Sequence, residues 1–367
     1  MHTFCDVDQK YQSASFAQTR AAARGRWVRP SSPEDGPAIV ELMKQAGLEP
    51  HEDPAHLHWK YWRARPDWSG SRSFVLTDGR DLLAHVAVVP GTLRTDGVAA
   101  RLVHPIDWAA RRDAVGAGVR VMRHLLGMTD YMLAVGGSSH TLKMLPLMGY
   151  LPRGTVTGYV RTLSPLRILQ RPSGARWKVA PRMARSLLWS LSAPGAVATG
   201  WQARRIGADE LGRLAHALPE SRPGMALFGR SADLLRHVLA CPIVPVELYA
   251  LEKAGRMLGV FILSYAPGQA RLADLWVHSA DPADWRALVE MAVRQAKQRG
   301  GLAELVAWSS DPKLSQVFET CGFHARLTLP IYLRSSRDFP VPEETLRVQM
   351  IDNDAFYLYF GRNELWA

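Results

Sequence analysis

Two glycines stand where the sequence predicts that a strand ends and a helix begins. The stretch RRDAVGAGVRVMRHLL, which starts at Arg111, places Gly116 and Gly118 on either side of one alanine, and apolar residues follow at helical spacing. A helix N-terminus has unpaired N–H groups and a partial positive charge, and glycine lacks the Cβ atom that would hinder a phosphate. Arg111 and Arg112 add positive charge. The turn therefore predicts a diphosphate site, with packing of the glycines as the alternative.

Three side chains near this turn or after it could transfer a proton. His104 and Asp107 lie in the preceding stretch ARLVHPIDWAA. If that strand alternates regularly, these two point to opposite faces, so at most one faces a site beside the turn. A hydrogen-bonded core histidine is the alternative role for His104. His140 lies at the start of a later helix, which Ser138 or Ser139 is expected to cap.

The elements that would position these residues occur twice in the same order. Residues 26–163 predict a strand, two helices, three strands, a helix at about 117–126, a strand, a helix and further strands, and residues 200–335 repeat this order. The fold class is α/β (α+β), with a mixed, mostly antiparallel sheet flanked by helices in each half. Residues 1–25 are expected to be a disordered leader, 164–199 a basic linker and 336–367 a C-terminal extension.

The composition is that of a globular protein with two domains. The chain has 367 residues, of which 47% are hydrophobic and 22% charged. No apolar run reaches the length of about 20 residues that spans a bilayer, and the N-terminus lacks the apolar core of a signal peptide. Three scattered cysteines fit neither a disulfide framework nor a zinc site. These features predict a reduced cytoplasmic location.

The charge and the histidines narrow the range of ligands. A net charge of +11 favours nucleic acid, membrane surfaces or phosphorylated cofactors, or is a solvated basic surface. No zinc-finger or aromatic-basic pattern is present, so specific nucleic-acid binding is not expected. His51, His56 and His58 lack the spacing of a metal motif, and no metal is expected.

The first half resembles the Gcn5-related N-acetyltransferase (GNAT) family over roughly residues 26–163. The resemblance rests on SPEDGPAIVELMKQAG, HWKYW, LLAHVAVVPGTL, the glycine turn and the helix ending in LMGY. The family binds acetyl-CoA with the pattern Gln/Arg-x-x-Gly-x-Gly/Ala, which falls here on residues 113–118. Gly116 and Gly118 match, but Asp113 stands where Gln or Arg is expected. Either Arg112 compensates for this carboxylate or the affinity for CoA is reduced.

The resemblance implies direct transfer of an acyl group from acetyl-CoA to an amine, without a covalent enzyme intermediate. His104 and Asp107 are then candidate bases. The tyrosine often used as the acid falls on Leu145, so that role is unfilled or has moved, for which His140 is a candidate. The residues implied in cofactor binding are Ile106, Trp108, Arg111, Arg112, Val115, Gly116, Ala117 and Gly118.

The second half resembles the same family in LADLWVHS and SSDPKLSQVFETCGF. Its equivalent turn, SADPADWRAL, has no glycine and carries two carboxylates, Asp281 and Asp284. A diphosphate would find neither close approach nor attraction there. The sequence therefore predicts that the second half has lost cofactor binding.

The activity predicted from these features is acyl transfer to a small-molecule or glycan amine, with an amino sugar or glycan precursor suggested by analogy. One alternative is a non-catalytic scaffold with two inactive halves, which Asp113 and Leu145 favour. Another is a transferase of the same fold that uses aminoacyl-tRNA, which leaves the glycine turn unexplained. The oligomeric state is open.

The linker has two interpretations. It contains six basic residues and no acidic one, and a helix at about 180–191 would carry Met183, Leu187, Leu188 and Leu191 on one side. Such a helix can pack this side across the two halves or lie on an anionic membrane. Pro181 and Pro194 leave room for about three turns, which favours packing.

Overall fold

The protein is represented by a computed structural model, which describes residues 25–95, 98–169, 179–191, 200–220, 224–336, 339, 342–357 and 365. Except for Gly25, the predicted leader lies outside the described residues, as does part of the linker. In the described part of the chain, no helix combines the length and the apolar character needed to cross a membrane.

The first half follows the predicted order of elements, and the helix after the glycine turn has the predicted bounds. In chain order the elements are β1 (Trp27–Pro30), η1 (Pro33–Asp35), α2 (Gly36–Gln45), α3 (Pro54–Leu57), η2 (His58–Trp62), β2 (Ser73–Thr77), β3 (Leu82–Thr95), β4 (Val98–Ala110), α4 (Ala117–Leu126), β5 (Tyr131–Val135), α5 (Ser139–Leu147) and β6 (Leu151–Thr162).

The linker and the second half follow, and the second half departs from the predicted order by one added strand, β8, and by a C-terminal segment. The elements are α6 (Pro165–Leu169), α7 (Val179–Leu191), β7 (Trp201–Ile206), η4 (Ala208–Ala217), β8 (Met225–Phe228), α8 (Ala232–Leu239), β9 (Val246–Lys253), β10 (Arg256–Ala266), β11 (Gln269–Val277), α9 (Pro282–Arg299), β12 (Glu304–Ser309), α10 (Pro312–Thr320), β13 (His324–Ser335), β14 (Thr345–Arg347), η5 (Met350–Asp352) and α11 (Asp354–Tyr357).

The strands of both halves form one mixed sheet in the order β1-β2-β3-β4-β5-β13-β6-β12-β11-β10-β9-β7. Most neighbours are antiparallel, and the parallel pairs are β4 with β5, β11 with β12, and β14 with β8. The predicted fold class, a mixed and mostly antiparallel sheet flanked by helices, is confirmed. The division into two domains stays a prediction.

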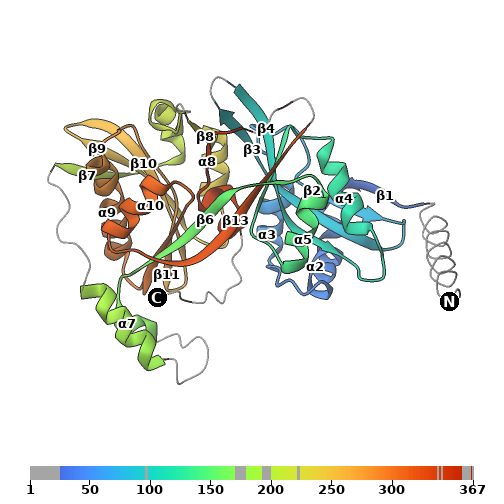
Figure 1. Cartoon of the computed structure of the whole chain (residues 1–367), viewed down its shortest axis with the longest axis horizontal. Coiled ribbons are helices and arrows are strands. Elements are labelled where there is room, and N and C mark those ends of the chain that lie inside the picture. Colours follow the sequence, from blue (N-terminus) through green and yellow to red (C-terminus); the bar gives the residue numbers. More distant parts are fainter. Residues whose placement is uncertain are drawn as a thin grey trace, which may run out of the picture.

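The last strands of the two halves are exchanged. β6 pairs with β12 and β13 of the second half, while β13 also pairs with β5 of the first half. Figure 1 shows these two long strands running between the two lobes of the molecule. The order of motifs along the sequence does not reveal this exchange, because both possible partners of each strand have the same apolar pattern.

Two faces of β4 pack against different helices. Leu102 and Ile106 belong to the cluster that includes Ile39 of α2, whereas Val103 belongs to the cluster that includes Val121 of α4. This alternation is the period-2 pattern of a strand buried on both faces. In the second half, α9 and α10 cover β10, β11 and β12.

Helix α7 packs by a different side from the predicted one. Ser186 is buried, and the Trp189 ring stacks on that of His324 at 4.1 Å between centroids. Leu187 and Leu188 are 46% and 66% exposed. The expected packing of the leucine side is therefore wrong for these two residues, because the tryptophan rather than the leucines contacts β13.

Candidate active site

The candidate site begins where β4 and β5 separate. The two parallel strands pair only at Leu102 with Tyr131 and at Val103 with Met132. β4 continues along β3 as far as Ala110. The two strands form no further pairs after Val103, so β4 presents backbone N–H and C=O groups to the space between them.

A β-bulge lies on β4 just beyond this point. Asp107 has a φ of 51°, and the register with β3 shifts between His85 and Ala87. The Asp107 carbonyl accepts a hydrogen bond from His85 Nδ1 at 3.1 Å, and Ser73 Oγ lies 2.9 Å from His85 Nε2. Burial lowers the pKa of His85 to about 4. The neutral imidazole therefore holds the bulge in place.

The bulge turns the Asp107 side chain toward the helices that precede β2. The Asp107 carboxylate lies 2.6 Å from Lys60 Nζ and accepts a hydrogen bond from the Tyr61 hydroxyl at 2.7 Å. Burial alone would raise the pKa of Asp107, but Lys60 and Tyr61 outweigh it and hold that pKa below its ordinary value. Asp107 is thus an ionised partner in a buried ion pair. The side chains of His104 and Asp107 therefore do not follow the regular alternation of a strand, because the bulge interrupts it.

His104 is the other candidate base on β4. Its ring is 3% exposed, and Nδ1 lies 3.0 Å from the Leu133 carbonyl oxygen, which can only accept. Nδ1 therefore carries the proton, and Nε2 has a free lone pair. Nε2 is buried and has no hydrogen-bond partner among the described residues. Burial lowers the pKa of His104, and the nearby Asp354 carboxylate offsets part of that effect, so the ring is neutral at pH 7.

The glycine turn has two glycines with different roles. Gly116 is the N-cap of α4 with a φ of 78°, a conformation that favours glycine, and apart from its chain neighbours and nearby helix backbone no atom of the described residues lies within 4 Å of where its Cβ would be. A Cβ on Gly118 would lie 3.1 Å from Trp108 Nε1, which donates to the Gly118 carbonyl at 3.1 Å. Gly116 thus leaves open space, and Gly118 permits close packing.

The arginines of the turn differ as well. Arg111 donates two hydrogen bonds to Asp113, at 3.0 and 2.6 Å, and a third to Asp81 at 2.9 Å. Asp113 lies beside Arg111 rather than Arg112, and Arg112 is exposed. Two carboxylates therefore neutralise Arg111, and Arg112 is the residue that offers a positive charge to a phosphate.

The remaining predicted residues are not all brought together. Ile106 and Ala117 are buried in apolar clusters, whereas Val115 is 74% exposed. His140 is exposed, and no hydrogen bond or ring contact in the described chain joins it to β4. Ser138 caps α5 by accepting a hydrogen bond from the backbone of Thr141 at 3.1 Å, as expected.

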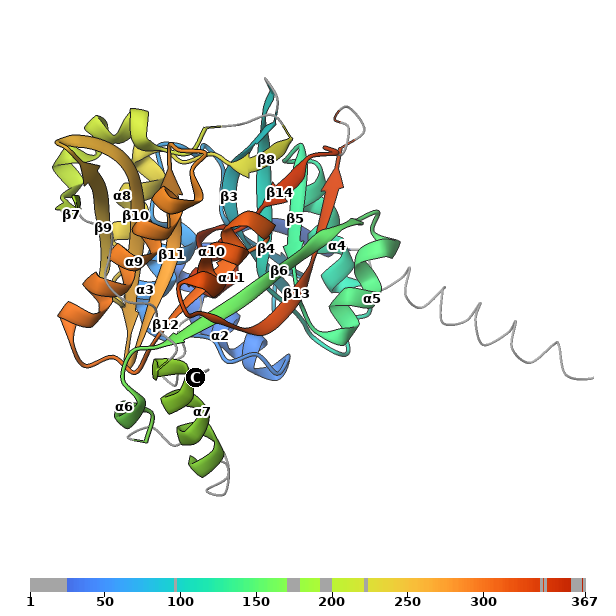
Figure 2. The same cartoon turned by 60° about the vertical axis from the view of Figure 1, so that its left-hand side comes forward.

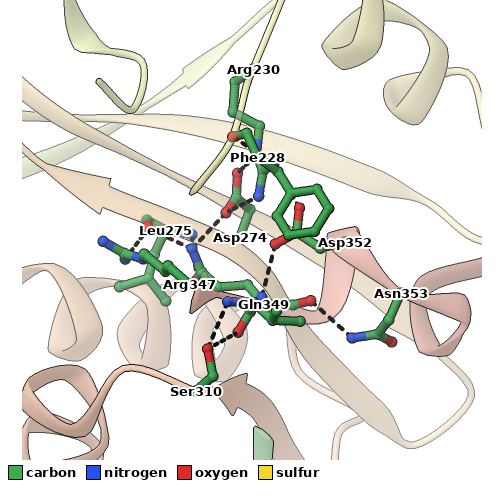
Figure 3. Close-up of polar contacts among 10 residues, drawn as sticks. Phe228, Arg230, Asp274, Leu275, Ser310, Arg347, Gln349, Asp352 and Asn353 are labelled. Carbon is green, nitrogen blue, oxygen red and sulfur yellow. Dashed lines mark hydrogen bonds and ion pairs between the residues drawn. The ribbon is translucent and has the colours of Figure 1, made fainter. Parts of the chain in front are cut away.

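The second half contains a corresponding separation of strands. β11 and β12 pair in parallel from Gln269 to Leu272, and a register shift marks a bulge beside Asp274. Here the chain's own C-terminal segment fills the gap (Figure 3). The Gln349 side chain accepts from the Leu275 N–H at 3.2 Å and donates to the Leu275 carbonyl at 3.1 Å. Both backbone groups that β11 offers at this point are therefore already paired.

Further contacts fix this segment in place. Val348 donates to Ser310 Oγ at 2.7 Å at the end of β12. Arg230 is buried and pairs with Asp274 and Asp352, each at 2.7 Å (Figure 3). Burial would lower the pKa of Arg230, but these two carboxylates raise it. The segment therefore bridges the two separated strands through buried polar contacts.

The turn after β11 carries two carboxylates that already have partners. Asp281 caps α9, and its carboxylate accepts from the Ala283 N–H at 2.8 Å. Lys253 Nζ lies 3.6 Å from the Asp284 carboxylate. A carboxylate therefore caps the N-terminus of α9, whereas the N-cap of α4 is Gly116, which has no side chain to cap the helix.

Comparisons with known proteins agree with this geometry. No family model and no curated protein sequence matches the chain. Among solved structures, Saccharomyces cerevisiae N-myristoyltransferase with bound myristoyl-CoA matches with a TM-score of 0.59 and 12% identity, over 89% of this chain and 83% of that chain. A probable N-acyltransferase from Enterococcus faecalis matches with a TM-score of 0.54 and 13% identity, over 84% and 72% of the two chains. A GCN5-related N-acetyltransferase from Anabaena variabilis matches with a TM-score of 0.54 and 10% identity over the same shares.

The chain has the GNAT fold. Within this fold, sequence reasoning missed three residues. Lys60 pairs with Asp107, Gln349 bonds to the backbone of Leu275, and the charge of Asp354 acts on His104. The lysine inside the apolar run HWKYW was a signal for a buried ion pair. Nothing near Gln349 or Asp354 in the sequence points to contacts with strands so far away along the chain. No group of three His, Cys, Asp or Glu side chains that could hold a metal ion occurs in the described ranges.

Proposed function

We propose that the protein is an N-acyltransferase that moves an acyl group from acyl-CoA directly to an amine. The observation that carries this proposal is the buried His104 Nε2, which has a free lone pair on β4 just past its last pair with β5. The GNAT fold supports acyl transfer in general. The acyl chain and the acceptor are parts of the proposal.

The space between β4 and β5 suits the pantetheine arm of acyl-CoA, and the glycine turn suits its diphosphate. Backbone groups of β4 between His104 and Trp108 that neither β3 nor His85 engages are available to the amides of the pantetheine arm. The start of α4, with open space at Gly116 and the charge of Arg112, suits the diphosphate. The thioester of acyl-CoA supplies an activated acyl carbon and a thiolate leaving group.

In the proposed reaction, His104 acts as the general base. Its Nε2 takes a proton from the ammonium of the acceptor, and the amine then attacks the acyl carbon. The new C–N bond forms as the C–S bond breaks, the imidazolium returns its proton to the departing thiolate, and the acylated nitrogen releases its second proton to water. Asp107 does not take part in proton transfer, because its pair with Lys60 keeps it ionised and occupied.

The class of acceptor is the one that the sequence suggests, an amine on a small molecule or glycan. We infer a primary amine on a small molecule or glycan, with an amino sugar as the first class to test. A panel of amino sugars, free amino acids and peptides, assayed with acetyl-CoA and longer acyl-CoA chains, separates these classes.

The test replaces His104 by asparagine. Asparagine Nδ2 can still donate to the Leu133 carbonyl, but the side chain lacks the Nε2 lone pair. We expect kcat to fall on the order of 100-fold or more, while acyl-CoA binding by calorimetry stays unchanged. Asp107→Asn is the matched control and is expected to lower stability, because it leaves Lys60 buried without a carboxylate.

Two outcomes would overturn the proposal in different ways. If His104→Asn binds acyl-CoA and keeps the parent kcat, another group is the base. If the parent binds no acyl-CoA of any chain length, the acyltransferase function is wrong and the non-catalytic scaffold is favoured.

A further inference from the structure

Helices α6 and α7 form a pair at the edge of the molecule, on the linker between the two halves. Both views show α7 projecting away from the sheet (Figures 1 and 2). The side of α7 that contacts the body is defined by Ser186 and Trp189, and the Arg185 guanidinium lies 4.9 Å from the centroid of the Trp189 ring. This contact fixes which side of α7 remains outside.

Three leucines of the pair are exposed. Leu187 and Leu188 on α7 are 46% and 66% exposed, and Leu166 on α6 is 71% exposed. Single exposed leucines are common on protein surfaces. Three on two short helices that pack on each other form a concentration of apolar side chains that calls for an explanation.

The charge of the same segment indicates what covers these leucines. Residues 164–199 contain six basic side chains and no acidic one, so this stretch carries a net charge of +6 within a chain of net charge +11. Exposed Arg167 lies next to Leu166. An apolar surface with basic neighbours matches the boundary of an anionic bilayer, where leucines enter the acyl region and arginines contact lipid phosphates.

We propose that the α6–α7 pair docks the protein on an anionic membrane surface. The contact is peripheral, since each helix would lie in the headgroup layer with its leucines inserted. The proposal is independent of the acyl-transfer site, because none of the residues involved belongs to β4, the glycine turn or the C-terminal segment. It brings the protein to acceptors carried by lipids or displayed at a membrane.

Sedimentation with vesicles tests the proposal. The full chain should bind vesicles that contain phosphatidylserine at low salt, bind far less to pure phosphatidylcholine, and be released by high salt. Leu187→Ser with Leu188→Ser should weaken binding by roughly tenfold per leucine. Arg167→Glu with Arg182→Glu should weaken it on the order of 30-fold.

Matched controls come from elsewhere on the surface. Leu147→Ser replaces a leucine that is 79% exposed on α5, and Arg213→Glu replaces an exposed arginine on η4; both should bind vesicles like the parent. Circular dichroism and acyl-CoA calorimetry should show every variant folded with parent affinity for acyl-CoA.

Three results would overturn the proposal. The parent could fail to sediment at low salt, or it could bind neutral and anionic vesicles equally. The leucine variant could instead convert a dimer to a monomer in analytical ultracentrifugation without vesicles, in which case a second copy of the chain covers these leucines.

Discussion

Arg111 at the glycine turn already has two carboxylate partners, so a phosphate that arrives there must compete with them. Asp113 accepts from two nitrogens of the guanidinium and Asp81 from the third. Asp113 itself stands at the position where the GNAT pattern has Gln or Arg. The residue that departs from the pattern thus reduces the positive charge of the turn in two ways, through its own charge and through its pairing with Arg111.

Replacing Asp113 by glutamine is therefore expected to tighten acyl-CoA binding by a few-fold. The substitution removes a negative charge beside the diphosphate and frees one side of Arg111. Calorimetry with acetyl-CoA measures the change. Asp81→Asn removes the other carboxylate partner of Arg111. Asp81 does not belong to the turn, so this substitution should tighten acyl-CoA binding less. Weaker binding by Asp113→Gln would mean that Asp113 orients the turn.

The elements of this fold were predictable from the sequence where local signals determine them. The bounds of α4, the cap of α5 by Ser138 and the order of strands in the first half follow from periodicity and capping residues, whereas β8 in the second half was not predicted. The bulge at Asp107 was not predictable, because it depends on contacts with Lys60 and His85, which belong to other elements. The sequence of a strand by itself predicts regular alternation of its side chains, and only its contacts with neighbouring elements show where that alternation is interrupted.

The C-terminal segment was also not predictable, for a related reason. Gln349 pairs with Leu275, and Val348 with Ser310, across large separations in sequence. Polar residues of this kind are common in loops, so their types carry no sign of a buried role. The separation of β11 and β12 is visible only once the strands are in place.

Gln349→Leu tests whether this segment is a structural part of the second half. The substitution keeps the size of the side chain but leaves the Leu275 N–H without a partner, and we expect a loss of about 2–4 kcal/mol in the free energy of unfolding. Urea denaturation measures it. Gln202→Leu, at an exposed position on β7, should change the free energy of unfolding little.

The number of acyl-CoA molecules bound per chain tests whether the space between β11 and β12 binds this ligand. Calorimetry should give one acyl-CoA per chain for the parent, and two would show that the space between β11 and β12 also binds it.

At the scale of the whole molecule, several histidines are buried without charge. Burial lowers the pKa of His56 to about 3 and that of His237 to about 2. Trp59 stacks on His237 at 4.9 Å between ring centroids, so these rings lie where elements of the two halves meet. Arg72, Arg65 and Arg63 lower the pKa of His237 further.

These histidines predict a loss of stability on mild acidification. The unfolded chain binds protons near pH 6.5 while the native protein does not, so the free energy of unfolding falls as the pH drops below that value. Each such histidine contributes about 1.4 kcal/mol per pH unit well below 6.5. Chemical denaturation between pH 7.5 and about 5 measures the slope. His237→Asn should reduce the slope by about 1.4 kcal/mol per pH unit, which corresponds to one proton. An equal slope in the parent and His237→Asn would contradict the conclusion that His237 is uncharged in the native protein.

The exchange of β6 and β13 has a consequence for synthesis on the ribosome. The outer neighbour of β5 is β13, which begins roughly 190 residues after β5 ends. At about 5–20 residues per second, the first half waits on the order of 10–40 s with that sheet edge unpaired. During this interval the nascent chain exposes a strand that can pair with other chains. Chaperone demand should therefore rise once β5 has emerged and fall when β13 emerges.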